Sequence, residues 1–137
     1  MIFDTHAHYD DEAFDEDREE LLSSLPEAGI KAVVNVGASL ESTERSLGLA
    51  ARYPFVYAAV GVHPSECGEM KEEDIRWLKK ASAEEKAVAV GEIGLDYYWD
   101  EPDRKIQKKW FSRQLDLAAE VKLPVIIHSR DAAQDTL

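Results

Sequence analysis

The segment that says most about the architecture is Pro124-Val125-Ile126-Ile127-His128, an uninterrupted apolar strand that ends in a histidine. The same continuous pattern occurs in Ala32-Val33-Val34 and in Ala58-Ala59-Val60. Continuous apolar strands favour a parallel sheet that is buried on both faces. Five strands are expected in all, over Met1–Thr5, Lys31–Gly37, Phe55–Val62, Ala87–Ile93 and Pro124–His128.

The segments between these strands have the pattern of amphipathic helices. In the first, Phe14, Leu21, Leu22 and Leu25 share one side, and the acidic stretch Asp10–Glu20 is interpreted as a solvated helix start. The other helices are expected over about Glu41–Arg52, Glu72–Ser82 and Asp103–Val121, with a fifth that begins at Asp131.

Strands that alternate with helices about every 30 residues indicate repeated βα units, in the sequential parallel order 1-2-3-4-5. Trp77 in the third helix and Ile106 in the fourth are expected to pack against this sheet. The chain of 137 residues suits one domain of the α/β class. A closed eight-stranded barrel takes ~250 residues, so five strands and four whole helices are too few to close one.

The composition limits the classes of function. Because 16 basic and 28 acidic side chains give a net charge of −12, a broad basic face for nucleic acid is excluded. Any phosphate must therefore be attracted locally. No apolar run approaches the ~20 residues of a membrane span, and Met1-Ile2-Phe3-Asp4 does not begin a secretory signal. The single cysteine, Cys67, fits a reducing compartment, so a cytoplasmic location is expected.

The four histidines all follow or end predicted strands, and none lies in a predicted helix. His6 and His8 follow the first strand, His63 the third, and His128 ends the fifth. Glu92 closes the apolar run of the fourth strand. In a parallel α/β protein, the carboxyl ends of the strands form the rim that carries ligand sites.

His6-Ala7-His8 is the sharpest local motif, because residues i and i+2 of a strand project to the same face. Two imidazoles placed in this way can bind one divalent metal ion, although a surface loop would also contain them. Glu92 stands among apolar residues and glycines. A buried carboxylate needs a partner, and the residues alone leave a metal ion and a buried arginine equally open.

Two further residues at the rim have less specific signals. Arg130 follows His128-Ser129 and is suited to a phosphate, or else is a surface charge at a helix start. His63 is open to three interpretations: a metal ligand, a substrate contact or a loop residue. Cys67 has no neighbouring base in the sequence, which disfavours a catalytic nucleophile.

Four segments in register together resemble the TatD family of metal-dependent deoxyribonucleases, within the amidohydrolase-like barrels. The match runs from Met1 to about Ala132, and Gln107, Phe111 and Gln114 also resemble the family's pattern. The segments are Phe3-Asp4-Thr5-His6-Ala7-His8, Gly61-Val62-His63-Pro64, Val90-Gly91-Glu92-Ile93-Gly94-Leu95-Asp96-Tyr97 and Pro124-Val125-Ile126-Ile127-His128-Ser129-Arg130-Asp131.

The resemblance implies a TIM-type (β/α)8 barrel with one or two divalent metal ions (Mg²⁺, Mn²⁺ or Zn²⁺) at its rim. By this resemblance His6 and His8 bind the first metal. Glu92 bridges the metals and is catalytic, and His128 belongs to the second metal. His63 and Arg130 face the substrate, which is DNA, single-stranded or at strand ends. A metal-activated water then cleaves the phosphodiester bond.

The resemblance also implies that residues 1–137 form a single partial βα-barrel domain that stops before the last three βα units. A further histidine and aspartate of the family are then absent, so weak metal binding and little nuclease activity are expected of these residues. Five strands leave two unpaired edges, so self-association is expected.

Two alternatives to a nuclease stay open. One is a related barrel hydrolase for small phosphoesters, lactones or amides, disfavoured because Glu92 stands where those relatives often carry a modified lysine. The other is an inactive metal-binding fragment. Neither a membrane nor an obligate protein partner is expected.

Overall fold

The computed structural model describes residues 1–137 as one five-stranded sheet with helices packed against it. The strands are β1 (Ile2–Ala7), β2 (Ile30–Val36), β3 (Val56–Val60), β4 (Ala87–Asp96) and β5 (Val125–Arg130). The helices are α1 (Arg18–Ser24), α2 (Leu40–Arg52), α3 (Glu72–Ser82), α4 (Arg104–Val121) and α5 (Ala133–Thr136), with 3-10 turns at Glu12–Phe14 and Pro64–Glu69.

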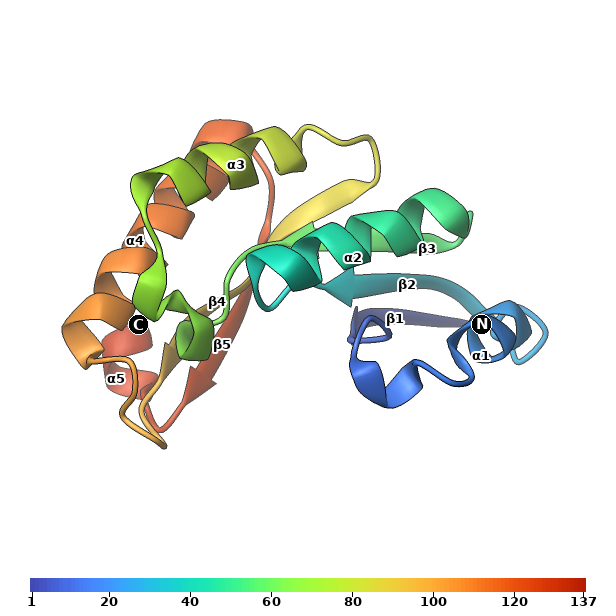
Figure 1. Cartoon of the computed structure of the whole chain (residues 1–137), viewed down its shortest axis with the longest axis horizontal. Helices are drawn as coiled ribbons and strands as arrows, with labels where there is room; N and C mark the ends of the chain where they lie inside the picture. Colours follow the sequence, from blue (N-terminus) through green and yellow to red (C-terminus); the bar gives the residue numbers. More distant parts are fainter.

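The strand order is β1-β2-β3-β4-β5, and every neighbouring pair is parallel. This confirms the predicted repeated βα units and the sequential order. The architecture is an α/β half-barrel. Figure 1 shows the amino terminus and α1 at one end of the long axis, and α5 with the carboxyl terminus at the other.

The core is divided between the two faces of the sheet. Three apolar clusters join strand residues to helix residues, as where Val60 of β3 packs with Leu78 of α3 and Leu117 of α4. The fourth cluster contains strand residues only, with Ala59 and Ala89 at its centre. Successive residues of a strand face opposite sides. The continuous apolar runs of the inner strands therefore supply the clusters that include helix residues and also the cluster made of strand residues only.

The two edge strands differ from the expectation of burial on both faces. Phe3 in β1 is 63% exposed and Ile127 in β5 is 47% exposed. The run Val125-Ile126-Ile127 is therefore not buried. An edge strand has a hydrogen-bonded neighbour on one side only, so apolar sequence alone does not cover it.

The predicted first helix is wrong at its start. Phe14 lies in a separate 3-10 turn, and α1 begins only at Arg18. The Arg18 guanidinium donates to the carbonyl oxygens of Tyr9 and Asp11, which holds the chain in a loop before the helix. Asp10, assigned to a solvated helix start, is buried.

Trp77 and Ile106 also contradict the expected packing, because both are exposed. On α3 the buried face carries Ile75, Leu78 and Ser82. A residue two positions after Ile75 is rotated by about 200° around the helix, so Trp77 points away from the sheet.

No helix of the structure is long and apolar enough to cross a bilayer.

Candidate metal centre

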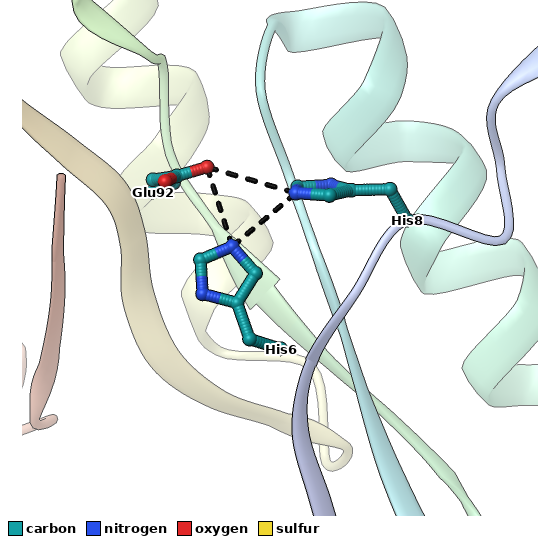
Figure 2. A group of neighbouring side chains, drawn as sticks. All are labelled: His6, His8 and Glu92. Carbon is teal, nitrogen blue, oxygen red and sulfur yellow. Dashed lines mark hydrogen bonds and ion pairs between the residues drawn. The ribbon is translucent and has the colours of Figure 1, made fainter.

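Three side chains meet here: His6 near the end of β1, His8 directly after that strand, and Glu92 within β4. The Nε2 atoms of His6 and His8 are 3.2 Å apart. Oε2 of Glu92 lies 3.4 Å from Nε2 of His6 and 3.7 Å from Nε2 of His8. Figure 2 shows the three groups pointing toward one another.

The spacing of these donor atoms fits a metal ion. Donors about 2.1 Å from a tetrahedral zinc ion lie about 3.4 Å from one another, and the three separations fall close to this value. Two imidazole nitrogens and a carboxylate oxygen are also a donor set that divalent metals accept.

The orientation of His8 supports the same interpretation. Its Nδ1 lies 3.0 Å from the carbonyl oxygen of Val36, at the end of β2. A carbonyl oxygen only accepts, so Nδ1 carries the proton and Nε2 of a neutral ring presents a lone pair to Glu92 and His6. Metal-binding histidines are commonly oriented in this way.

A second group of donors shares Glu92, which is only 8% exposed. Nδ1 of His128 lies 3.1 Å from Oε1 of Glu92, and Nε2 of the same ring lies 2.9 Å from Oδ2 of Asp96. His63 packs against His128 with the ring centroids 4.3 Å apart. Glu92 therefore has one oxygen toward each group.

His63 is held in a different tautomer from His8. The Ser65 backbone N–H donates to Nδ1 of His63 at 3.0 Å, which caps the turn Pro64–Glu69. The proton of a neutral His63 ring is then on Nε2. Burial, followed by the nearby His128, lowers the pKa of His63 and so favours the neutral ring.

Glu92 is aimed by an irregularity in β4. Gly91 pairs with Ile126 and Ile93 with Ile127, so Glu92 is an extra residue in the register against β5. Bulges of this kind re-aim a side chain. Gly91 is required here, since a Cβ would lie 2.7 Å from the Cβ of Ile126. The Glu92 N–H donates instead to the carbonyl of Gly37 at 2.8 Å.

An irregularity also lies beside His6. The pairing of β1 with β2 shifts between Asp4 and Ala7.

Farther along β4, Gly94 has φ of +145°, and a Cβ there would lie 1.9 Å from the carbonyl oxygen of His128. Glycine at this position allows β4 and β5 to approach closely enough for His128 to reach Glu92.

Arg130 does not join the group. Its guanidinium lies 3.8 Å from the ring centroid of Tyr98. An open pocket of about 480 Å³ lies beside the candidate centre and is lined by His8, His63 and Glu92 among other residues. Arg130 is absent from that lining. Of the predicted site residues, the structure brings together His6, His8, His63, Glu92 and His128.

Asp96 also contacts this group and was not predicted, although it lies in the quoted segment that begins at Val90 and is the last residue of β4. Its backbone is fixed by Gln107, which accepts the Asp96 N–H at 2.8 Å and donates to the Asp96 carbonyl at 3.0 Å. A carboxylate at the end of an apolar strand is a signal in the sequence that could have identified Asp96.

Cys67 is buried, and burial raises the pKa of its thiol to about 11, which agrees with a structural role.

Comparison with known proteins gives the family of this chain. The family model described as TatD related DNase matches residues 3–137. An uncharacterized metal-dependent hydrolase, YabD, of Bacillus subtilis is 45% identical over 137 residues, which is 100% of this chain and 54% of that protein. The 3'-5' ssDNA/RNA exonuclease TatD of Cronobacter sakazakii is 35% identical over 131 residues, covering 96% of this chain and 50% of the relative.

Solved structures agree with these relatives. The crystal structure of the TatD homologue YjjV of Escherichia coli superposes with a TM-score of 0.90 at 36% identity, covering 98% of this chain and 53% of that one. The chain spans about half the length of the curated relatives it matches. Because the family model covers nearly every residue, the chain belongs to the TatD related DNase family.

Proposed function

We propose that this chain holds the metal-binding side chains of a hydrolase that cleaves phosphodiester bonds of DNA, in single strands or at strand ends. The observation that carries the proposal is the position of Glu92. Its two oxygens face His6 and His8 on one side and His128 on the other. A carboxylate between imidazoles suits one or two divalent ions such as Mg²⁺, Mn²⁺ or Zn²⁺.

Each side chain of the candidate centre has a separate task. His6 and His8 would hold a first metal ion, His128 would hold a second, and Glu92 would lie between the two. Asp96 lies against the other nitrogen of His128 and keeps this ring turned toward Glu92. When bound, divalent metals neutralise charge on phosphate oxygens and lower the pKa of a water molecule.

His63 is suited to the phosphate rather than to a metal. The Ser65 N–H donates to Nδ1 of His63, so the proton of a neutral ring is on Nε2 and is available to an acceptor. An N–H group donates to a phosphate oxygen, whereas a metal ligand needs a lone pair. The lowered pKa of His63 keeps the ring neutral near pH 7. His63 therefore orients the substrate beside Glu92.

The choice of a nucleic acid as substrate rests on the relatives and on charge. The Cronobacter sakazakii relative is named a 3'-5' ssDNA/RNA exonuclease. A chain with a net charge of −12 repels a long polyanion, so phosphate capture must be local, at the metals and at single donors. This favours a strand end or a single strand over a long duplex.

The first test is metal binding, measured by calorimetric titration of Mn²⁺ into the 137-residue chain. Glu92→Gln keeps the shape of the side chain and removes the shared anion, so affinity is expected to fall by about tenfold or more. Glu44→Gln, an exposed carboxylate on α2, is the control and should bind as the parent does. Equal binding by Glu92→Gln and the parent would contradict the proposed centre.

The second test compares substrates in the presence of Mn²⁺. The expected result is weak cleavage of a single-stranded oligonucleotide that depends on Mn²⁺ and is lost in Glu92→Gln. Faster turnover of a lactone, an amide or a small phosphoester would support the alternative hydrolase. Metal binding without turnover of any substrate would overturn the proposed activity for this chain and leave a metal-binding fragment.

A further inference from the structure

Two aromatic side chains lie exposed directly after β4. Tyr98 is 52% exposed and Trp99 is 73% exposed, the largest exposure of any tryptophan or tyrosine in the chain. Their rings meet edge to face, with centroids 4.8 Å apart and an interplanar angle of 86°. Exposed rings of this size lose contact with water when a flat apolar group covers them.

This aromatic pair is tied to the candidate metal centre. The backbone N–H of Tyr98 donates to Oδ1 of Asp96 at 3.1 Å. The other oxygen of the same carboxylate lies 2.9 Å from Nε2 of His128. One side chain therefore fixes both the start of the aromatic loop and a ring of the centre. The loop between β4 and α4 lies at the same end of the molecule as α5 (Figure 1).

Arg130 adds a positive charge to the pair. Its guanidinium stacks on the ring of Tyr98, 3.8 Å from the centroid, and no carboxylate lies within ion-pair distance of it. Five of the six other arginines pair with acidic side chains, namely Arg18, Arg45, Arg52, Arg104 and Arg113, and Arg76 on α3 does not. In an acidic chain, a guanidinium without a carboxylate partner, two residues after the candidate ligand His128, suits a phosphate.

We propose that Tyr98, Trp99 and Arg130 form a nucleotide subsite, which binds a base of single-stranded nucleic acid on the ring of Trp99 and a neighbouring phosphate on Arg130. The inference rests on the proposed function, and it names how the substrate is held. One face of the Tyr98 ring is taken by Arg130, so Trp99 offers the free stacking surface. Every base has a flat face, so such a subsite accepts all sequences.

The test measures binding of short dye-labelled oligonucleotides to the 137-residue chain by fluorescence anisotropy. EDTA is present, so neither metal nor hydrolysis contributes. One tetranucleotide carries bases and the other is abasic with the same dye and phosphates. Trp99→Ala is expected to weaken binding of the first by about tenfold and to leave the abasic one unchanged. Trp99→Phe keeps a stacking ring and should restore most of the affinity.

Two further variants separate the contributions. Arg130→Ala should weaken both oligonucleotides, because it removes the phosphate contact. Trp77→Ala, an exposed tryptophan on α3, is the matched control and should change neither. Sedimentation of each variant without oligonucleotide reports whether the rings contact a second copy of the chain.

The outcomes distinguish this subsite from the proposed activity. Equal loss for both oligonucleotides in Trp99→Ala, or no loss for either, overturns the stacking subsite even when Mn²⁺-dependent cleavage persists. A change in sedimentation without a change in oligonucleotide binding makes the rings a contact between copies and also overturns it. Selective loss for the base-containing strand supports the subsite, even when cleavage itself is absent.

Discussion

Asp10 and Asn35 fix the chain directly after the candidate metal ligand His8. The Asn35 amide oxygen accepts the Tyr9 N–H at 2.6 Å, and its amide nitrogen donates to Oδ1 of Asp10 at 2.8 Å. The hydroxyl of Ser42 donates to Oδ2 of Asp10 at 2.7 Å. The carboxylate is buried, and its charge is held by neutral donors, which makes each of them costly to remove.

The first prediction concerns Asn35→Ala. The change leaves the Tyr9 N–H without its acceptor and the Asp10 carboxylate without one donor. The free energy of unfolding is expected to fall by about 2–3 kcal/mol, as measured by urea denaturation. Because His8 precedes Tyr9, Mn²⁺ affinity should fall as well. Ser42→Ala removes two hydrogen bonds, one to Asp10 and one from the Ala38 N–H, whereas the Asn35 side chain makes three, so it should cost less. An unchanged free energy of unfolding in Asn35→Ala would show that this hydrogen-bond network does not stabilise the fold.

The sequence predicted the histidines of the candidate centre more readily than this supporting network. His6, His8 and His128 stand at strand ends, where a parallel sheet gathers its ligands, so position alone marks them. Asp10 lies in an acidic run and has the pattern of a surface residue. Only its partners across the fold distinguish it, and a single sequence does not contain them.

At the level of elements, α4 holds two strand ends by side-chain amides. Gln114 accepts the Val62 N–H at 2.8 Å and donates to the Val62 carbonyl at 3.1 Å. Gln107 makes the same pair of bonds with Asp96. Each glutamine thus acts as a neighbouring strand would. Val62 precedes His63 and Asp96 contacts His128, so α4 positions two residues of the centre.

The second prediction concerns Gln114→Leu, which keeps an apolar volume and removes both hydrogen bonds. Two buried backbone groups of Val62 lose their partners, so the free energy of unfolding should fall by about 2–4 kcal/mol. Urea denaturation measures this effect. Gln134→Leu, on the exposed α5, is the control and should be neutral. A neutral result for Gln114→Leu would mean that water replaces the amide.

The five strands and their order followed from apolar runs and turn residues, but the irregularities that aim Glu92 and flank His6 did not. Which residue is the extra one depends on the pairing with the adjacent strand. A glycine within a strand is compatible with a bulge, but Gly91 does not indicate which way the side chain of Glu92 points. The exposure of β5 was missed for a similar reason, since an apolar run does not reveal whether its strand lies at an edge.

For the whole molecule, the open sheet determines the surface. β1 and β5 are the two ends of the strand order, so each has one unpaired side. Ile2 and Phe3 of β1 and Ile127 of β5 are exposed. Unpaired strand edges with apolar side chains are a ready surface for pairing with another chain. In this chain they stand at opposite ends of one sheet, so both can take part.

The third prediction is that the 137-residue chain self-associates through these edges. Sedimentation velocity over a range of concentrations should show species larger than a monomer, because pairing satisfies backbone groups and covers apolar side chains. Phe3→Lys and Ile127→Lys place a charge on each edge and should shift the distribution toward the monomer, the double variant most strongly. Trp77→Lys removes an exposed aromatic from α3, away from both edges, and should leave it unchanged.

Comparing the edge variants with Trp77→Lys separates pairing of strand edges from nonspecific hydrophobic association. If Trp77→Lys dissociates the larger species as well as the edge variants do, any exposed apolar residue contributes to self-association and the strand edges have no special role. A parent chain that sediments as a monomer at all concentrations would mean that its edges are protected by their twist alone. Dissociation by Phe3→Lys with none by Ile127→Lys would assign the contact to β1, and so to the edge that carries His6.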